Sequence, residues 1–297
     1  MTISVKVSEA HHTGNDKFIL TIICSDAIGL VAAVTGFLRN ESCFIDESLQ
    51  YGDPVTQRFF MRLAFTPSAK SFPIADIERR FDEVAIHFGM TWSAVRADRR
   101  PRVMIAVSRL GHCLNDLLHR WHSGQLAINV VCVISNHDDM RSMVEWHGVP
   151  YHYLPVTEAT KISQEETWLQ MVDDLDLDLI VLARYMQILS PAASKKLSGR
   201  CINIHHSFLP SFKGARPYQQ AYERGVKIIG ASAHYVTAEL DEGPIIEQAV
   251  ERVDHSHGPA DLIATGRDLE TLVLARAVRW HAESRVLVNG SKTVVFR

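Results

Sequence analysis

The first third of the chain combines strand-like and helix-like hydrophobic patterns. β-Branched and aromatic runs predict strands, whereas apolar residues at spacings of three and four predict helices. The predicted strands are 18–24, 43–51, 56–65 and 91–97, and the predicted helices are 29–38 and 74–88. This β-α-β-β-α-β order is typical of a ferredoxin-like α+β sandwich. We therefore predict a small α+β domain over residues 1–98.

After residue 98 the pattern changes to alternating strands and helices. The predicted strands are 103–107, 130–135, 152–154, 179–183 and 228–235, and the predicted helices are 114–122, 140–146 and 165–172. Continuously apolar strands are typical of a parallel sheet covered on both faces by helices. The sequence thus predicts a Rossmann-like, mostly parallel sheet in an α/β domain over residues 99–297. The boundary follows from the charged, proline-containing stretch 96–102, which few contacts are expected to cross.

Composition narrows the partners that such a chain can bind. Thirty-one basic and thirty-four acidic residues give a net charge of -3, which excludes a global positive field for nucleic acid or an anionic membrane. No apolar run approaches the ~20 residues of a membrane-spanning helix. The five cysteines are widely spaced, which favours buried free thiols in a reducing, cytoplasmic compartment. We expect a small-molecule partner.

The first strand-to-helix turn of the second domain bears on cofactors. It reads Ser108-Arg109-Leu110-Gly111-His112-Cys113, with one glycine. A dinucleotide site needs three glycines there, because the backbone must approach the pyrophosphate closely. The bulk of Arg109 and Leu110 therefore argues against a nicotinamide or flavin cofactor, and we expect no cofactor.

The loop after the predicted strand 179–183 is rich in large side chains. Its residues are Arg184, Tyr185, Met186, Gln187, Ile188 and Leu189. Such a run either fills the core or forms the mainly apolar wall of a pocket for a flat heterocycle. The loops that follow strands form the ligand site of a parallel sheet, so the second interpretation stays open beside the first.

A carboxamide, an imidazole and a carboxylate follow in the later part of the domain. Asn203 and His205 lie two positions apart in a short predicted strand, so their side chains point to the same face. Asp241 lies in the loop after predicted strand 228–235. A carboxylate beside an imidazole orients it and favours its charged form. Taken singly, His205 fits a core histidine and Asp241 a turn residue; their combination with Asn203 favours catalysis.

Histidines also raise the question of a metal site. A group of them clusters in the later part of the chain: His205, His206, His234, His255 and His257. Their spacings match neither a Cys/His structural zinc pattern nor a pair on one helical face. We therefore expect no metal.

At these residues the sequence resembles the folate-dependent formyltransferase family. The resemblance rests on Asn203-Ile204-His205-x-Ser207-x-Leu209-Pro210, Gly214 and Leu240-Asp241-x-Gly243-Pro244, and it extends over residues 102–281. It implies the formyltransferase fold and catalytic roles for Asn203, His205 and Asp241. It also implies a folate pocket between the loop 184–189 and a facing wall. The wall residues are Tyr235, Val236, Thr237 and Leu240.

The closer resemblance, over the whole chain, is to the hydrolytic branch of that family. Asp26-x-x-Gly29-Leu30 and the segment 57–62 resemble an ACT domain, which implies an amino-acid effector site at Asp26, Gly29 and Leu30 and a homo-oligomer. A simpler interpretation has Asp26 cap the helix and Gly29 permit close packing. The two interpretations stay open.

The predicted function is hydrolysis of 10-formyltetrahydrofolate to tetrahydrofolate and formate, which would balance one-carbon and formate supply for purine synthesis. Transferases of the family hold the acceptor phosphate in a glycine-rich first turn, and Arg109, Leu110, His112 and Cys113 replace that surface here. Water is then the expected nucleophile, and Asp241 orients either His205 or the water. The alternatives are formyl transfer to an amine other than glycinamide ribonucleotide, and a sensor of folate or amino acid without catalysis.

Overall fold

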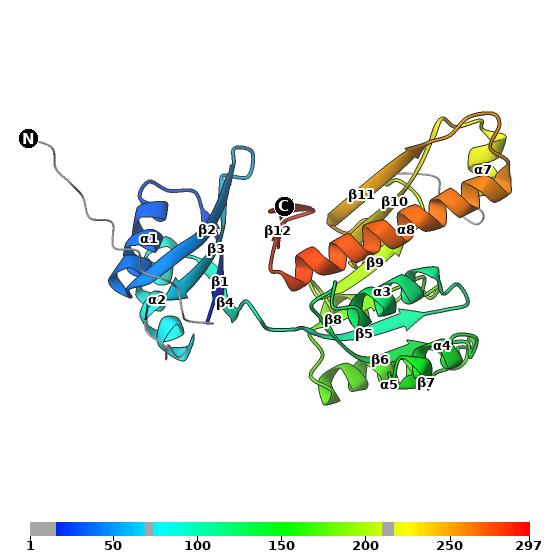
Figure 1. Ribbon diagram of the computed structural model, residues 1–297, viewed down its shortest axis with the longest axis horizontal. Coiled ribbons are helices and arrows are strands. Elements are labelled where there is room, and N and C mark those ends of the chain that lie inside the picture. The colour runs from blue at the N-terminus through cyan, green and yellow to red at the C-terminus, as the bar shows by residue number, and fades with distance from the viewer. Residues whose placement is uncertain (1–15, 69–73, 210–216) are drawn as a thin grey trace, which may run out of the picture. The chain divides into compact units, whose positions relative to one another are not determined.

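The computed structural model describes residues 16–68, 74–209 and 217–297. The chain folds into two compact units that divide between Arg99 and Arg100 (Figure 1). Each unit has its own sheet and its own hydrophobic core. Pro210 and Gly214, which belong to the sequence motif, lie outside the described residues.

The first unit is an antiparallel sheet with two helices on one face. Its elements are β1 (Phe18–Ser25), α1 (Leu30–Asn40), β2 (Cys43–Asp53), β3 (Arg58–Pro67), α2 (Ile74–Phe88) and β4 (Thr91–Arg96). The strand order is β2-β3-β1-β4, and the pairs β2–β3, β1–β3 and β1–β4 are antiparallel. Together with the order of elements along the chain, this is a ferredoxin-like arrangement.

The helices of this unit are held by regularly spaced apolar side chains. Helix α1 buries Leu30, Val34 and Leu38, which recur every fourth residue and so lie on one helical face. Ile77 and Phe81 do the same in α2. Both helices pack on alternate residues of β1 and β3, because successive strand residues point to opposite faces of the sheet.

The second unit is an α/β layer structure. Its elements are β5 (Arg102–Val107), α3 (His112–His122), β6 (Asn129–Ser135), α4 (Arg141–Trp146), β7 (Tyr151–Tyr153), α5 (Lys161–Asp174), β8 (Leu179–Leu182), α6 (Pro191–Lys196), β9 (Cys201–His205), α7 (Pro217–Glu223), β10 (Ile228–Tyr235), β11 (Ile245–Arg252), α8 (Pro259–Ala282), β12 (Val286–Asn289) and β13 (Lys292–Val295). The main sheet has the order β11-β10-β9-β8-β5-β6-β7. Strands β5 to β9 pair in parallel, which confirms the predicted mostly parallel sheet.

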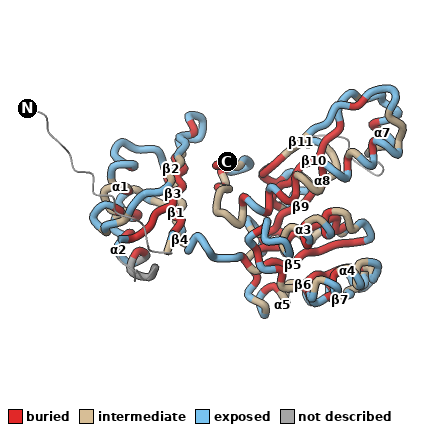
Figure 2. The backbone as a smooth tube through the Cα atoms, viewed as in Figure 1, coloured by how far each residue is buried: buried red, intermediate tan, exposed pale blue. Residues whose placement is uncertain are grey.

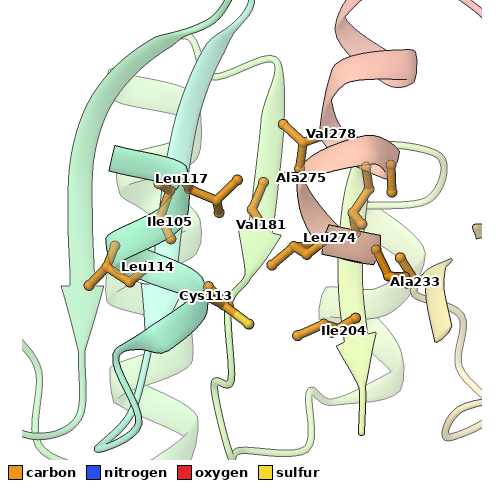
Figure 3. Close-up of a cluster of buried hydrophobic side chains, with 14 of the residues drawn as sticks. Ile105, Cys113, Leu114, Leu117, Val181, Ile204, Ala233, Leu274, Ala275 and Val278 are labelled. Atoms are coloured by element: carbon orange, nitrogen blue, oxygen red, sulfur yellow. The ribbon is translucent and has the colours of Figure 1, made fainter. Parts of the chain in front are cut away.

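Helices cover both faces of this sheet with separate apolar layers. Helices α3, α4 and α8 pack on one face, and α5 and α6 pack on the other. Figure 3 shows Leu274, Ala275 and Val278 of α8 turned toward Ile105 of β5 and Val181 of β8. The inner strands β5, β6, β8 and β10 are accordingly buried along most of their length (Figure 2). This burial explains why their sequences read as continuous apolar runs.

The path of the chain after β10 differs from a simple parallel sheet. β10 runs antiparallel to β9, and its last residue, Tyr235, lies opposite Ile202 near the start of β9. The segment that follows returns to the same strand, because the Tyr235 amide donates to the Pro244 carbonyl over 2.9 Å. Asp241 therefore reaches β9 from a loop that folds back, and not from the end of a parallel strand.

Two further sequence predictions can be compared with the fold. No helix among the described residues is long and apolar enough to cross a bilayer. All five cysteines are free thiols, as predicted. Four of them are buried, but Cys43 is only half-buried, so the prediction of burial is wrong for Cys43. It lies at the start of β2, which is an edge strand of the first sheet among the residues that the structure describes.

Candidate active site

A cavity of about 580 Å³ lies where the loops after β8 and β10 face the end of β9. This volume is in the range of small-molecule pockets. Nine of the ten predicted folate-binding residues line the cavity: Arg184, Tyr185, Met186, Gln187, Ile188, Leu189, Val236, Thr237 and Leu240. Asn203, His205 and Asp241 line the same cavity. The structure thus brings together residues that lie up to 57 positions apart, from Arg184 to Asp241.

Tyr235 is the tenth predicted folate-binding residue, and it does not line this cavity. Its side chain is 3% exposed, and its hydroxyl lies 2.7 Å from His281 Nδ1 on helix α8. The reason is the alternation of side chains along β10, since the preceding residue, His234, points toward the cavity. We therefore leave Tyr235 out of the candidate site.

The central contact of the site joins an imidazole and a carboxylate. His205 Nδ1 lies 3.2 Å from Asp241 Oδ2, and both side chains are largely shielded from solvent. The hydrogen bond to His205 comes first, and a smaller effect of nearby His234 second, among the causes that hold the pKa of Asp241 well below its usual range. Asp241 is therefore ionised at neutral pH, and its carboxylate orients the His205 ring.

The backbone around Asp241 is conformationally restricted. Asp241 itself has a φ of 58°, in the left-handed region that side chains other than Gly, Asn and Asp seldom adopt. Two residues later, a Cβ on Gly243 would lie 1.7 Å from the Tyr235 carbonyl oxygen. Only glycine fits at this position, so the Asp-x-Gly-Pro sequence fixes the path that carries the carboxylate to His205.

His234 is a site residue for which the sequence predicted at most a supporting role. Its Nδ1 lies 2.9 Å from the Tyr235 carbonyl oxygen, so that nitrogen carries the proton of a neutral ring. Its Nε2 then accepts a hydrogen bond from Asn203 Nδ2 at 3.3 Å. The second proton of that amide nitrogen stays available to the cavity. The signal for this role is cross-strand pairing, because His234 lies directly opposite Asn203.

His206 follows the candidate catalytic histidine and lies against it. The two rings stack with centroids 5.0 Å apart and an interplanar angle of 30°. Burial, with a further contribution from the charge of Arg184, lowers the pKa of His206 to about 4. The ring lines the cavity in its neutral form at physiological pH.

The loop 184–189 is fixed at its start by a serine from the first turn of the unit. Ser108 is 3% exposed, and its hydroxyl donates to Asn136 Oδ1 over 2.7 Å while it accepts from the Met186 amide over 3.0 Å. The Ser108 amide also donates to the Arg184 carbonyl over 3.2 Å. Arg184 adopts a φ of 64°. These bonds hold Met186 and Ile188, both more than half exposed, as apolar walls of the open cavity.

Behind this loop lies a buried ionic cluster. Glu270 of α8 is 1% exposed and lies 2.7 Å from His112 Nε2, 2.9 Å from the Tyr218 hydroxyl and 3.4 Å from Arg184 Nε. Burial alone would raise the pKa of Glu270, but the His112 hydrogen bond and the Arg184 charge outweigh it and lower the pKa. The cluster keeps a charged carboxylate behind the cavity wall.

The same cluster bears on metal binding. Among the described residues, ligand atoms of His112, Cys113 and Glu270 lie within 4.8 Å of one another. Burial raises the pKa of the Cys113 thiol, which opposes the thiolate form that a metal needs. Arg184 already supplies a positive charge to the Glu270 carboxylate. The contacts therefore fit an internal ion pair better than a bound cation.

The first strand-to-helix turn of the second unit is filled by its own side chains. His112 begins α3 and turns toward Glu270, and Cys113 is fully buried. Arg109 and Leu110 are exposed to solvent. The turn therefore presents bulky side chains. Transferases of the family are expected to hold the acceptor's phosphate at this position.

The predicted effector residues lie at the start of α1 in the first unit. Gly29 has a φ of 92° and no heavy atom within 4 Å of a Cβ built on it. Leu30, in contrast, is 2% exposed and belongs to the core, so its side chain faces no solvent. The Asp26 amide donates to the Gln57 carbonyl over 2.9 Å, which ties this turn to the hairpin of β2 and β3.

The fold and the cavity define a class of protein. Residues 101–278 match the model of the formyl transferase family. The second unit also resembles the crystal structure of glycinamide ribonucleotide transformylase 1 from Symbiobacterium toebii, with a TM-score of 0.63 and 28% identity over 67% of this chain and 95% of that one.

Similarity to one branch of this class covers nearly the whole chain. Formyltetrahydrofolate deformylase from Corynebacterium sp. (strain P-1) is 50% identical over 95% of this chain and 98% of its own length. The crystal structure of formyltetrahydrofolate deformylase from Burkholderia mallei ATCC 23344 is 49% identical, with a TM-score of 0.91 over 95% of this chain and 100% of that one. The chain belongs to the formyltetrahydrofolate deformylase family.

Proposed function

We propose that this protein hydrolyses 10-formyltetrahydrofolate to tetrahydrofolate and formate. One observation carries the proposal: Asn203, His205 and Asp241 share one cavity in a chain that is 37–50% identical to relatives named formyltetrahydrofolate deformylase. The folate is the substrate, and the proposed reaction uses no further cofactor.

The chemistry follows from the charge that develops during attack on an amide. Water adds to the formyl carbon, and negative charge grows on the formyl oxygen. Asn203 Nδ2 and protonated His205 donate hydrogen bonds to that oxygen, a stabilisation of a few kcal/mol per donor in a water-poor site. Asp241, 3.2 Å from His205 Nδ1, orients the imidazole and offers a negative charge to its protonated form. This contact favours orientation of His205 over orientation of the water.

The folate ring system would lie between the loop 184–189 and the segment 236–242. Met186, Ile188 and Leu240 supply apolar surface that is exposed in the free cavity. A flat heterocycle covers such surface on binding, and the burial of apolar area contributes to affinity. The filled turn at His112 and Cys113 leaves little room for an acceptor's phosphate, which supports water as nucleophile.

The test is an assay of formate release by the purified protein. We expect turnover of 10-formyltetrahydrofolate without any amine, and no increase on addition of glycinamide ribonucleotide. A rate that depends on an added amine would replace hydrolysis by formyl transfer. Folate binding without any turnover would instead indicate a sensor.

For the first unit we propose an ACT-like regulatory role, with an amino-acid carboxylate at the amides that follow Gly29. The left-handed Gly29 leaves the start of α1 accessible, and a helix N-terminus favours a negative charge. Because the Leu30 side chain is buried, its backbone amide alone would take part. Calorimetric titration with methionine and with glycine tests this role, and absence of both heat and rate change would leave a structural unit.

We also propose that the protein acts as a homo-oligomer in a reducing compartment, the cytoplasm. The strand β2 lies at the edge of its sheet, and edge strands pair readily with another chain. The five free thiols suit a reducing environment. Sedimentation analysis of the full chain would reveal the oligomeric state, and a monomer would exclude this assembly.

A further inference from the structure

Hydrolysis needs a group that takes a proton from water, and the residues already assigned are committed elsewhere. Asp241 is paired with His205. Both nitrogens of His234 are engaged, one with the Tyr235 carbonyl and the other with Asn203. His205 itself must donate to the formyl oxygen. A neutral water is a weak nucleophile, so the proposed reaction lacks a base among these residues.

His206 is the remaining imidazole in the lining of the cavity, within the part of the chain that the structure describes. Its ring lies 5.0 Å from that of His205, centroid to centroid, and so borders the space next to the oxyanion donors. Glu239 and Glu242 also line the cavity, but both side chains are exposed to solvent. His206, in contrast, lies directly against the His205 ring, next to the proposed oxyanion donors.

The surroundings of His206 keep its ring unprotonated before the reaction. The charged and titratable groups near it are Arg184, His205, Tyr218, Asp241 and Glu270. Burial comes first and the Arg184 charge second among the causes that lower its pKa to about 4. Glu270 and Asp241 act in the opposite direction. Their negative charges lie where they stabilise an imidazolium formed for a moment during turnover.

We propose that His206 is the general base that removes a proton from the attacking water; this inference rests on the proposed hydrolysis. The water oxygen bonds to the formyl carbon as its proton passes to His206, and the carbonyl electron pair moves to the oxygen held by Asn203 and His205. When the carbonyl re-forms, the bond from carbon to the folate nitrogen breaks. That nitrogen takes the proton from His206, and the ring is neutral again.

The decisive variant is His206→Phe, which keeps an aromatic ring against His205 but has no nitrogen to accept a proton. We expect formate release to fall by a factor of roughly 100 or more in kcat, with KM for the folate little changed. His255→Gln is the matched control, because His255 is exposed in the same unit, and it should keep the full rate. His206→Gln gives a second comparison where the phenylalanine variant does not fold.

A second nucleophile shows whether His206 acts as a general base or only positions other groups. Hydroxylamine attacks the formyl carbon without prior loss of a proton, and it yields formohydroxamate and tetrahydrofolate. His206→Phe should keep this reaction close to the wild-type rate, whereas Asn203→Ala should lose both reactions, because it removes an oxyanion donor. Equal losses with water and hydroxylamine in the His206 variants, or undiminished formate release, would overturn the proposal. Absence of formate release by the wild type would instead refute the proposed function.

Discussion

Asp241 is the residue whose replacement tests the charge pattern of the site most directly. Asp241→Asn keeps the size of the side chain and tolerates the φ of 58°, but it removes the charge 3.2 Å from His205. We expect kcat for formate release to fall by roughly 100-fold or more while folate binding changes little. Equilibrium titration with a folate analogue measures the binding. Retained turnover in this variant would remove Asp241 from the mechanism.

Gly243 provides a test of the backbone path that carries Asp241. In Gly243→Ala the new Cβ would lie 1.7 Å from the Tyr235 carbonyl, so the loop must move away from β10. We expect lower activity together with a lower free energy of unfolding, by about 1 to 3 kcal/mol for an overpacked position. Gly258→Ala is the control, since its Cβ would meet Asp261 at an ordinary 3.6 Å. Equal effects of the two changes would argue against a special role of Gly243.

At the scale of residues, the sequence reached Asn203 and His205 through one simple rule. The period-two alternation of a strand placed Asn203 and His205 on one face, and both line the cavity. The same rule explains why Tyr235 does not line it. The pairing of His234 with Asn203 was not predicted, because it depends on strand register, which is not visible in one segment alone.

At the scale of elements, the loop 184–189 depends on one hydroxyl group. Ser108→Ala removes the acceptor for the Met186 amide and the donor to Asn136, which leaves polar groups without partners at a cost of about 1 kcal/mol or more. We expect a higher KM for the folate with a smaller change in kcat. Ser123→Ala, on the exposed end of α3, is the control, and an equal KM for both variants would contradict this role.

The hydrophobic pattern predicted the existence of most elements because each buries a continuous apolar face. It did not predict the direction of β10, since an apolar strand reads the same in either orientation. Nor did it single out α8, whose buried side includes Gly266 and the charged Glu270. Glu270 needs partners from α3 and α7, and such long-range pairing is invisible to local periodicity.

For the whole molecule, two half-buried histidines, His206 and His281, predict how stability depends on pH. Burial lowers the pKa of both His206 and His281 to about 4 from 6.5. Between these values the unfolded chain binds protons that the folded chain does not, so stability is full above pH 6.5 and is lost as the pH falls toward 4. Each histidine contributes up to roughly 3 kcal/mol to this loss.

Urea unfolding followed by tryptophan fluorescence at several pH values measures this dependence. His281→Gln should flatten the dependence, because it removes one of the two groups while it leaves the cavity lining in place. Asp241 affects the free energy of unfolding in a different pH range. Its pKa is lowered, so the stability that its ionised carboxylate contributes is lost only at lower pH. A free energy of unfolding that stays constant from neutral pH to about pH 5 would contradict the expectation.

The buried thiols can be used to measure local opening of the fold. Cys201 lies on β9, two residues before Asn203, and burial raises the pKa of its thiol far above the usual value. A thiol reagent attacks only the exposed thiolate, so the labelling rate of Cys201 reports how often β9 separates from its neighbouring strands. Bound folate that clamps β9 in place would slow that labelling, which makes ligand binding measurable without any turnover.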